Sequence, residues 1–279
     1  MITSIIFSKD RPLQLDLCLD GIKKNFKDSI QNIVIHNNSE QFDEAHQILQ
    51  QEHQDVEFWR QSDSLFKDVF HAVTSAKNNL VCFFTDDDIF YAPFMCESYD
   101  FLKDPNISCL SLRMGLNIGE RSHDGRTVQD LCRQAWQTDN GMIAWPKTIH
   151  GYGSYWSYDL SLDGHIYKKS SMLEMMDELC FIQPRYNWAN TPNVLESTIQ
   201  RFWTNGPNFI FAPENSVVVN SPNNRVQKTH KNKSGEVHDY SSEFLLDKYK
   251  SGSRIDLDTL DFSDIKCPHT EIDILKGLK

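Results

Sequence analysis

Short apolar segments alternate with amphipathic segments through the first third of the chain, and this alternation constrains the fold more than any other feature. The segment at 2–8 is rich in β-branched residues, and the segment that follows it carries apolar residues at helical spacing. The same order of extended segment, polar loop and helix recurs at 32–39 and 43–54, at 56–61 and 64–78, and ends in the apolar segment 80–84. This pattern predicts an α/β fold in which a mostly parallel central sheet is flanked by helices.

Three polar clusters follow the predicted strands, each at the point where a strand ends. They are Ser8, Lys9, Asp10 and Arg11, then Asn37, Asn38 and Ser39, and last Asp86, Asp87 and Asp88. Open α/β sheets bind ligands beyond the carboxyl ends of their strands. We therefore expect the three clusters to share one site.

The aspartate run is the most unusual of the clusters, because four apolar residues precede it and Ile89 and Phe90 follow it. Adjacent carboxylates repel one another unless water or a cation compensates their charge. On an extended chain Asp86 and Asp88 would point to one side and Asp87 to the other, although a turn directly after the strand would break that alternation. A solvated surface loop is the alternative, and we favour a divalent-cation site because the flanking residues indicate a buried strand end.

The second half of the chain has a different pattern. Asp163-Gly164 predicts a hairpin, a helix is expected to begin at Ser170 or Ser171, and another has Pro192 in its first turn. Late strands are expected within 208–227. We divide the chain into an amino-terminal half at 1–112 of the size that binds a nucleotide, a variable second half of the same fold at 113–250, and an acidic tail at 251–279.

Charge and composition exclude several classes of protein. The 279 residues carry 28 basic and 39 acidic side chains, so the net charge of −11 disfavours nucleic acid as a partner. No apolar run approaches the length of a membrane span, and the seven cysteines show neither a disulfide framework nor paired zinc spacing. We expect a cytoplasmic protein, and the sequence does not fix its oligomeric state; peripheral association with the inner face of the membrane is implied only by the family resemblance that follows.

In order and rough spacing, "IIFSKDRP", "IVIHNNS" and "VCFFTDDDIF" resemble the GT-A glycosyltransferases, in particular the broad family-2-like group. "GHIYKKSSMLEMMDEL" resembles the segment of that family that precedes and forms the helix under the acceptor site, and "PNVLES" stands where the family places its acidic catalytic residue. The resemblance covers roughly residues 2 to 230. One departure is that the usual Glu-Asp pair of the family is here Leu195-Glu196.

This resemblance implies that the chain transfers a sugar from a nucleoside diphosphate donor, with UDP favoured, to a glycan or lipid-linked saccharide, as in polysaccharide biosynthesis. It implies Mn²⁺ or Mg²⁺ on Asp88, assisted by Asp86, because a metal stabilises the charge that develops on the leaving diphosphate. The remaining donor contacts would come from Ser8, Lys9, Asp10, Arg11, Asn38, Lys67 and Asp87. Asp10 could instead cap the following helix, and Lys67 could lie on a solvated helix face.

For an inverting reaction the acceptor hydroxyl needs a base, and Glu196 is the first candidate. Its alternative role is structural, since Asn193 and Glu196 have capping-box spacing. Asp163 is the second candidate, although an aspartate before glycine is commonly a turn residue. A retaining enzyme would need neither residue in this role.

A late polar loop and an aromatic cluster complete the predicted site. His230 would reach the metal and Arg225 the diphosphate, unless their loop is simply exposed. Trp156 and Tyr155 are candidate platforms for the acceptor sugar, because aromatic rings stack on apolar sugar faces; the alternative is that they belong to the core.

Two other enzyme classes and one binding class compete with this interpretation. A sugar-1-phosphate nucleotidyltransferase would need a glycine-rich basic loop after the first strand, and "FSKDRPLQ" has no glycine. A haloacid-dehalogenase-type phosphatase would carry its aspartates on the first strand. A non-catalytic carbohydrate-binding protein could retain the same fold, since fold alone does not prove activity.

Overall fold

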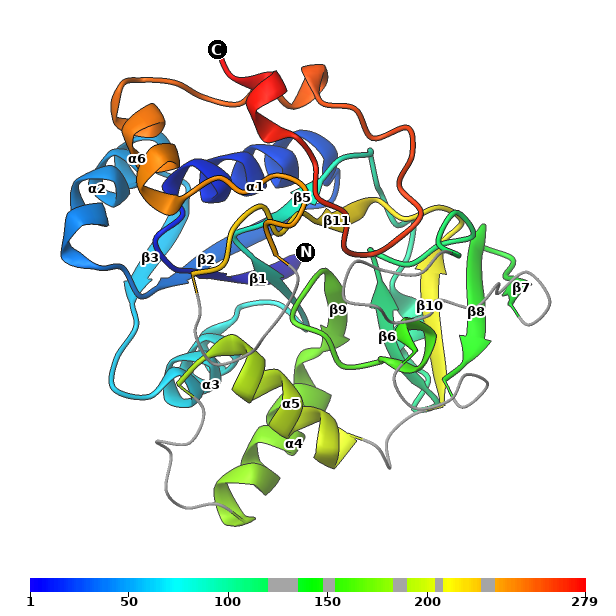
Figure 1. Ribbon diagram of the computed structural model, residues 1–279. Coiled ribbons are helices and arrows are strands. Elements are labelled where there is room, and N and C mark those ends of the chain that lie inside the picture. Colours follow the sequence, from blue (N-terminus) through cyan, green and yellow to red (C-terminus); the bar gives the residue numbers. More distant parts are fainter. Residues whose placement is uncertain (120–134, 148–153, 183–189, 204–207, 227–233) are drawn as a thin grey trace.

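A computed structural model describes residues 1–119, 135–147, 154–182, 190–203, 208–226 and 234–279 (Figure 1). Its strands are β1 (Ile2–Ser8), β2 (Ile30–His36), β3 (Val56–Arg60), β4 (Leu80–Thr85), β5 (Asp88–Phe90), β6 (Ile107–Ser111), β7 (Trp136–Gln137), β8 (Met142–Pro146), β9 (His165–Lys168), β10 (Phe209–Pro213) and β11 (Val218–Asn220). Its α-helices are α1 (Pro12–Asn25), α2 (Asp43–Glu52), α3 (Leu65–Ser75), α4 (Lys169–Ile182), α5 (Pro192–Trp203) and α6 (Ser242–Lys250).

The described strands form one large sheet and one small ribbon. The large sheet has nine strands in the order β3-β2-β1-β4-β9-β6-β10-β8-β7, and β11 pairs with β5 in the ribbon. The strands β3, β2, β1 and β4 are parallel to one another, whereas β9 is antiparallel to both of its neighbours and β8 is antiparallel to β10 and β7. All strands of the large sheet except β9 and β8 therefore run in one direction, which confirms the predicted mostly parallel α/β fold.

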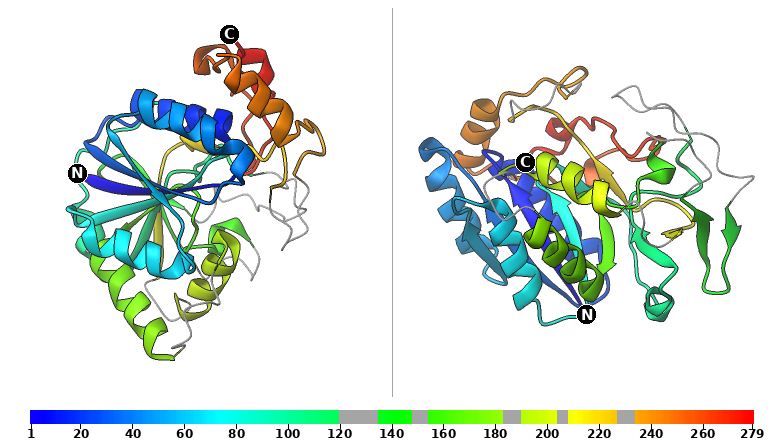
Figure 2. Two further views of the ribbon diagram at one scale, coloured as in Figure 1. Left: turned by 90° about the vertical axis from the view of Figure 1, so that its left-hand side faces the viewer. Right: turned by 90° about the horizontal axis from the view of Figure 1, so that it is seen from below.

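Helices cover both faces of the sheet (Figure 2). The helices α1, α2 and α6 pack together on one face, and α3, α4 and α5 pack together on the other. Because both faces of β1 are covered, all of its residues are buried, and for this reason its sequence is apolar without strict alternation. Within the described residues, no helix combines the length and the apolar character that crossing a bilayer requires.

A glycine in α1 allows the segment after the aspartates to pack closely against that helix. A Cβ atom at Gly21 would lie 3.1 Å from the carbonyl oxygen of Phe90 and 3.2 Å from its nitrogen, closer than ordinary van der Waals contact. A side chain at this position would therefore push β5 away from α1. The glycine thus helps to fix the position of the strand that begins with Asp88.

The second half confirms the predicted helices and late strands but not the predicted hairpin. Gly164 does adopt the left-handed conformation of a turn, with φ of +69°. The strand after it, β9, instead inserts between β4 and β6, and the Gly164 N–H donates to the carbonyl oxygen of Phe83 at 2.7 Å. Asp163-Gly164 thus forms a turn, as predicted. The strand that follows this turn pairs with strands that are distant in sequence and not with the segment directly before it.

The tail from residue 251 onward is packed against the rest of the molecule. It contains two short 3₁₀ helices, Leu257–Thr259 and Ile274–Gly277, and Ile255, Ile265 and Ile272 are buried. In Figure 1 the tail passes over α1 and then beside β11. This course brings a segment with weak sequence patterning next to the carboxyl ends of the central strands.

Candidate active site

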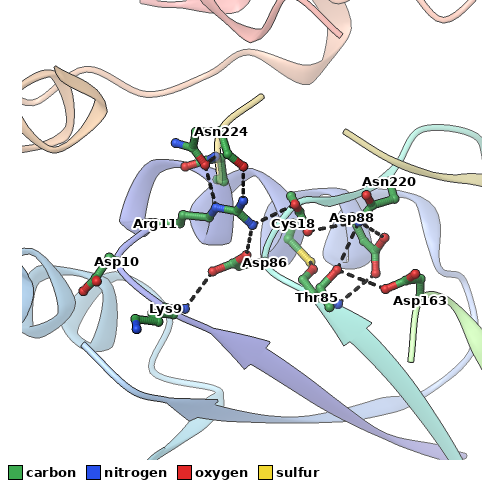
Figure 3. Close-up of polar contacts among 12 residues, drawn as sticks. Lys9, Asp10, Arg11, Cys18, Thr85, Asp86, Asp88, Asp163, Asn220 and Asn224 are labelled. Carbon is green, nitrogen blue, oxygen red and sulfur yellow. Dashed lines mark hydrogen bonds and ion pairs between the residues drawn. The ribbon is translucent and has the colours of Figure 1, made fainter. Parts of the chain in front are cut away.

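Arg11 is the centre of the polar cluster at the carboxyl end of β1. It directly precedes α1, whose first residue Pro12 suits the first helical turn because it has no N–H to satisfy. Its side chain is buried, and Nη1 donates to Asp86 Oδ1 at 2.9 Å and to Asp87 Oδ2 at 2.7 Å. Nε donates to Asn224 Oδ1 at 2.7 Å, and Nη2 donates to the Asn224 carbonyl oxygen (Figure 3). One guanidinium thus compensates two of the three aspartates.

The aspartate run forms a turn between β4 and β5. Asp86 and Asp87 occupy the turn, Asp88 begins β5, and Asp88 Oδ2 accepts the N–H of Thr85 at 2.8 Å. The alternation of an extended chain therefore does not apply here. Asp86 lies beside Asp87 on the guanidinium of Arg11, and Asp88 points elsewhere.

Asp88 faces a second carboxylate in the interior. Asn220 Nδ2 donates to Asp88 Oδ1 at 3.1 Å and to Asp87 Oδ1 at 3.0 Å, and Thr85 Oγ1 donates to Asp163 Oδ1 at 3.3 Å. Burial raises the pKa of Asp88 well above its usual range, and the negative charges of Asp163 and Asp87 raise it further. Asp88 is therefore a buried carboxyl group whose ionised form favours an added cation.

The loop between β1 and α1 joins the ends of three strands. The Lys9 N–H donates to Asp86 Oδ2 at 2.9 Å, and burial raises the pKa of Asp86 to about 6 although Arg11 opposes the shift. Asp10 has a φ of +55°, a left-handed conformation that aspartate tolerates better than most residues. Its carboxylate accepts the N–H and the hydroxyl of Ser39, at 2.7 and 3.0 Å. Asp10 therefore joins the ends of β1 and β2 and does not cap α1.

The other members of this edge are Ser8 and Asn38. Asn38 is buried, and its Oδ1 accepts the N–H of Asp10 at 3.4 Å. Ser8 is also buried, and in the part of the chain that the structure describes its hydroxyl has no hydrogen-bond partner. A buried hydroxyl of this kind is suited to bonding a ligand.

Asp163 and Arg113 form a buried ion pair on the opposite side of Asp88. Arg113 Nη1 donates to Asp163 Oδ2 at 2.9 Å, and the guanidinium lies 5.4 Å from the ring centroid of Tyr155. Burial raises the pKa of Asp163 although Arg113 opposes the shift. Two arginines, one from each half of the chain, therefore flank the carboxylate cluster.

Glu196 lies on α5 and points back toward the turn before β9. Its Oε1 accepts the N–H of Leu162 at 3.0 Å, and Thr191, not Asn193, caps the helix by accepting the N–H of Val194 at 3.4 Å. Burial raises the pKa of Glu196 to about 7, and the charge of Asp163 adds to the shift. The capping box that the spacing suggested is absent from this helix, and Glu196 instead accepts hydrogen bonds from the segment before β9.

The remaining predicted residues are buried in the core, exposed, or outside the described residues. Trp156 and Tyr155 are buried; the Trp156 ring packs at 88° against that of Trp145, and a fully covered ring offers no face to a sugar. Lys67 is exposed on α3, and its N–H donates to the Ser64 cap of that helix. Arg225 is exposed directly after Asn224, and His230 lies outside the described residues.

Four residues of the site were not predicted from the sequence. They are Arg113, Asn220, Asn224 and His269. Asn220 and Asn224 belong to a polar stretch after a late apolar strand, which was a usable signal. No sequence signal pointed to Arg113 or His269. Arg113 reaches the site through the pairing of β6 in the sheet, and His269 reaches it through the packing of the tail.

The carboxylates fit a divalent cation in a different combination from the predicted one. Among the described residues, no group of three or more His, Cys, Asp or Glu side chains is arranged to hold a metal ion. Asp86 accepts the Arg11 guanidinium on Oδ1 and the Lys9 N–H on Oδ2, at 2.9 Å each, whereas Asp163 holds Arg113 on Oδ2 and the Thr85 hydroxyl, at the longer distance of 3.3 Å, on Oδ1. Asp163 also lies beside Asp88, and burial raises the pKa of both carboxyl groups. Mg²⁺ is commonly held by one or two carboxylates together with substrate phosphates. These two residues therefore fit an ion that a diphosphate would share.

No protein-family model and no curated protein sequence matches this chain. A solved structure of S. aureus TarS 1–349 has 14% sequence identity and a TM-score of 0.45, over 76% of this chain and 60% of that chain. The same protein in complex with UDP-GlcNAc has 13% identity and a TM-score of 0.45, over 84% of this chain and 60% of that chain.

A third structure is the mannosyltransferase PcManGT from Pyrobaculum calidifontis in complex with GDP-Man and Mn²⁺. It has 14% identity and a TM-score of 0.31, over 39% of this chain and 34% of that chain. This chain thus spans less than two thirds of the proteins it matches, and their activities are proposals for it. Two of these solved structures contain a nucleotide sugar, UDP-GlcNAc in one and GDP-Man in the other.

Proposed function

We propose that this protein is a glycosyltransferase that moves a sugar from a nucleoside diphosphate donor, with UDP favoured, to a hydroxyl group of a glycan or lipid-linked saccharide. The observation that carries the proposal is that the ends of β1, β2 and β4 meet at one edge of the sheet, and that next to the end of β4 Asp163 interacts with both Asp88 and Glu196. Ligands of α/β sheets bind beyond such strand ends. Clustered carboxyl groups with displaced pKa values are also typical of catalytic sites.

On the donor side, we assign the nucleoside to the edge formed by Ser8, Asp10 and Asn38. Ser8 contributes a buried hydroxyl, and the other two fix the backbone between β1 and β2. The exposed Lys9 and Arg225, which directly follow Ser8 and Asn224 in the chain, would supply positive charge for the phosphates. Arg11 does not serve as a phosphate ligand in this scheme, because its donors are already engaged by Asp86, Asp87 and Asn224.

Asp88 and Asp163 would hold Mn²⁺ or Mg²⁺ together with the diphosphate of the donor. Bound there, the ion would stabilise the negative charge that develops on the leaving diphosphate. Arg113 keeps Asp163 oriented, and Asn220 does the same for Asp88. The protein thus supplies two fixed carboxylates on the side where the leaving group departs.

On the acceptor side, Glu196 is the proposed general base. A pKa of about 7 leaves a useful fraction ionised at neutral pH and makes the carboxylate a stronger base than an ordinary glutamate. As the acceptor oxygen bonds to the anomeric carbon, Glu196 takes the hydroxyl proton. The bond from that carbon to the diphosphate oxygen breaks, and its electron pair stays with the diphosphate. Asp163 is less suited to this role because it is paired with Arg113.

The first test is calorimetric titration of UDP, GDP, CDP and ADP into the wild-type protein, with Mn²⁺ and with EDTA. We expect UDP to bind in the presence of Mn²⁺ and to bind more weakly in EDTA. Asp88→Asn should lose the part of the UDP affinity that depends on Mn²⁺, because the substitution removes the charge of a metal ligand while keeping the side-chain shape. Asp177→Asn, an exposed change on α4, is the matched control and should bind as the wild type does.

Two outcomes would contradict the proposal. A folded wild-type protein that binds none of the four nucleotides would favour the non-catalytic carbohydrate-binding alternative. Turnover of a nucleoside triphosphate with a sugar 1-phosphate, without transfer to an acceptor, would instead favour a nucleotidyltransferase. Release of UDP from a UDP-sugar that depends on an added saccharide would support glycosyl transfer.

A further inference from the structure

The C-terminal tail places an imidazole between the two halves of the carboxylate cluster. The tail runs beside β11, where the Asn220 N–H donates to the Pro268 carbonyl oxygen and the Thr270 N–H donates to the Asn220 carbonyl oxygen, both at 3.0 Å. This pairing sets His269 opposite Asn220. The position of His269 is therefore fixed by the backbone as well as by its side chain.

The hydrogen bonds of Asn220 determine which of its amide atoms faces His269. Its Nδ2 lies 3.0 Å from Asp87 Oδ1, 3.1 Å from Asp88 Oδ1 and 3.1 Å from Thr85 Oγ1 (Figure 3). The Asp87 carboxylate, which is paired with Arg11, only accepts hydrogen bonds, so the Asn220 atom that faces it must be the amide nitrogen. The Asn220 Oδ1 then points to His269 Nδ1, at 3.0 Å, and requires a donor there.

The second ring nitrogen of His269 has the opposite requirement. His269 Nε2 lies 3.3 Å from Arg113 Nη1, and a guanidinium only donates. Nε2 must therefore accept while Nδ1 carries the proton. Of the forms available to an imidazole, only the neutral Nδ1–H tautomer satisfies both neighbours.

We infer that His269 is a positioning residue, which in this one tautomer couples Arg113 to Asn220. Arg113 orients Asp163, and Asn220 orients Asp87 and Asp88. The imidazole thus fixes the two carboxylate groups relative to each other although it touches neither of them in these hydrogen bonds. This inference rests on the proposed function, because the arrangement that it maintains is the one assigned to the donor diphosphate.

The tautomer can be measured on the free protein. Long-range ¹H–¹⁵N correlation spectra of protein labelled at histidine distinguish the two neutral tautomers and the imidazolium. His269→Phe identifies the resonance by its loss. We expect an Nδ1–H tautomer for His269 at neutral pH. An Nε2–H tautomer or an imidazolium at neutral pH would overturn the inference, whether or not the protein binds nucleotides.

Substitutions separate hydrogen bonding from packing. The His269 ring lies 5.3 Å from that of Tyr155, so phenylalanine preserves the ring contact but has neither polar atom. Asparagine packs less well, yet its amide can donate to Asn220 Oδ1 from nearly the position of Nδ1. We expect His269→Phe to weaken Mn²⁺-dependent UDP binding about tenfold and His269→Asn to retain more of the affinity.

Which variant binds UDP more tightly distinguishes hydrogen bonding from packing. If His269 acted through packing alone, His269→Phe would retain more affinity than His269→Asn. Urea denaturation of both variants shows whether each is folded under the binding conditions. His71→Phe, an exposed histidine on α3 that also lies beside an aromatic ring, is the matched control and should not change binding. If the wild-type protein binds no nucleotide, the proposed function fails, and the tautomer spectrum still tests the coupling of Arg113 to Asn220.

Discussion

Replacing Arg11 with methionine tests how the chain tolerates its three adjacent aspartates. Methionine keeps much of the length of the side chain and removes the charge. The wild-type guanidinium is only 7% exposed and pairs with Asp86 and Asp87, whose side chains are equally well covered. Removing one partner of a buried ion pair costs about 3–5 kcal/mol, because the charge left behind cannot be solvated. We expect Arg11→Met to lose stability in this range at pH 7.

The pH dependence of that loss follows from the carboxyl groups. The pKa of Asp86 is already raised to about 6 with Arg11 present, and removing the guanidinium would raise it further. As the pH falls below 7, the stranded carboxylates of the variant take up protons and their uncompensated charge disappears. The difference in stability between wild type and variant should therefore shrink as the pH is lowered from 7 to 5.

The assay is urea denaturation followed by tryptophan fluorescence at pH 7 and pH 5. Adding Asp87→Asn to Arg11→Met should recover part of the stability, because it removes one stranded charge. Arg60→Met is the matched control: Arg60 pairs with Asp43 but its side chain is 60% exposed, so we expect a loss of at most about 1 kcal/mol. A loss for Arg11→Met as small as that of the control, and independent of pH, would refute this account of the aspartate run.

Three further perturbations address other parts of the molecule. Burial lowers the pKa of His46 to about 3, and its ring nitrogens have no hydrogen-bond partner among the described residues, so the contribution of His46 to stability should fall by about 2 kcal/mol as the pH falls from 7 to 5; in urea denaturation the stability of wild type relative to His46→Phe should fall by this amount between the two pH values. Glu196→Gln should lower kcat about 10²–10⁴-fold without changing UDP affinity, and wild-type activity should rise with pH through about 7 as Glu196 loses its proton, which steady-state rates would check. Lys147→Met should cost about 3 kcal/mol in thermal or urea unfolding, because the buried Asp159, 3.0 Å from Lys147 Nζ, would lose its cation; a loss below about 1 kcal/mol would contradict the assigned ion pair.

The alternation of strand and helix was readable because it depends on local periodicity. The apolar content of 2–8 required a strand covered on both faces, and the helices that cover the two faces include those encoded at 12–25 and 65–75. Parallel order then brings the carboxyl ends of β1, β2 and β4 to one edge. The residues at those ends, among them Arg11, Asn38 and Asp86, could therefore be predicted to share a site.

The pairing of charges within that site depended on the tertiary structure. The sequence favoured a cation on Asp86 and Asp88, but a turn directs Asp86 to Arg11, a residue 75 positions away in the chain. Short-range rules cannot reveal such a contact, because its energy depends on burial and on partners brought together by the whole fold. The same reason explains the core positions of Tyr155 and Trp156.

The C-terminal tail shows most clearly the difference between what the local sequence indicates and what the tertiary structure determines. Its sequence shows an acidic segment with weak periodicity but does not indicate which residues the segment contacts. That His269 lies against Asn220 follows only from the backbone pairing between the tail and β11. Local sequence thus determined the elements of this protein and the edge of the sheet to which we assign the site, whereas long-range packing, which sets the burial and the hydrogen-bond partner of each charge, decided which residues that edge contains.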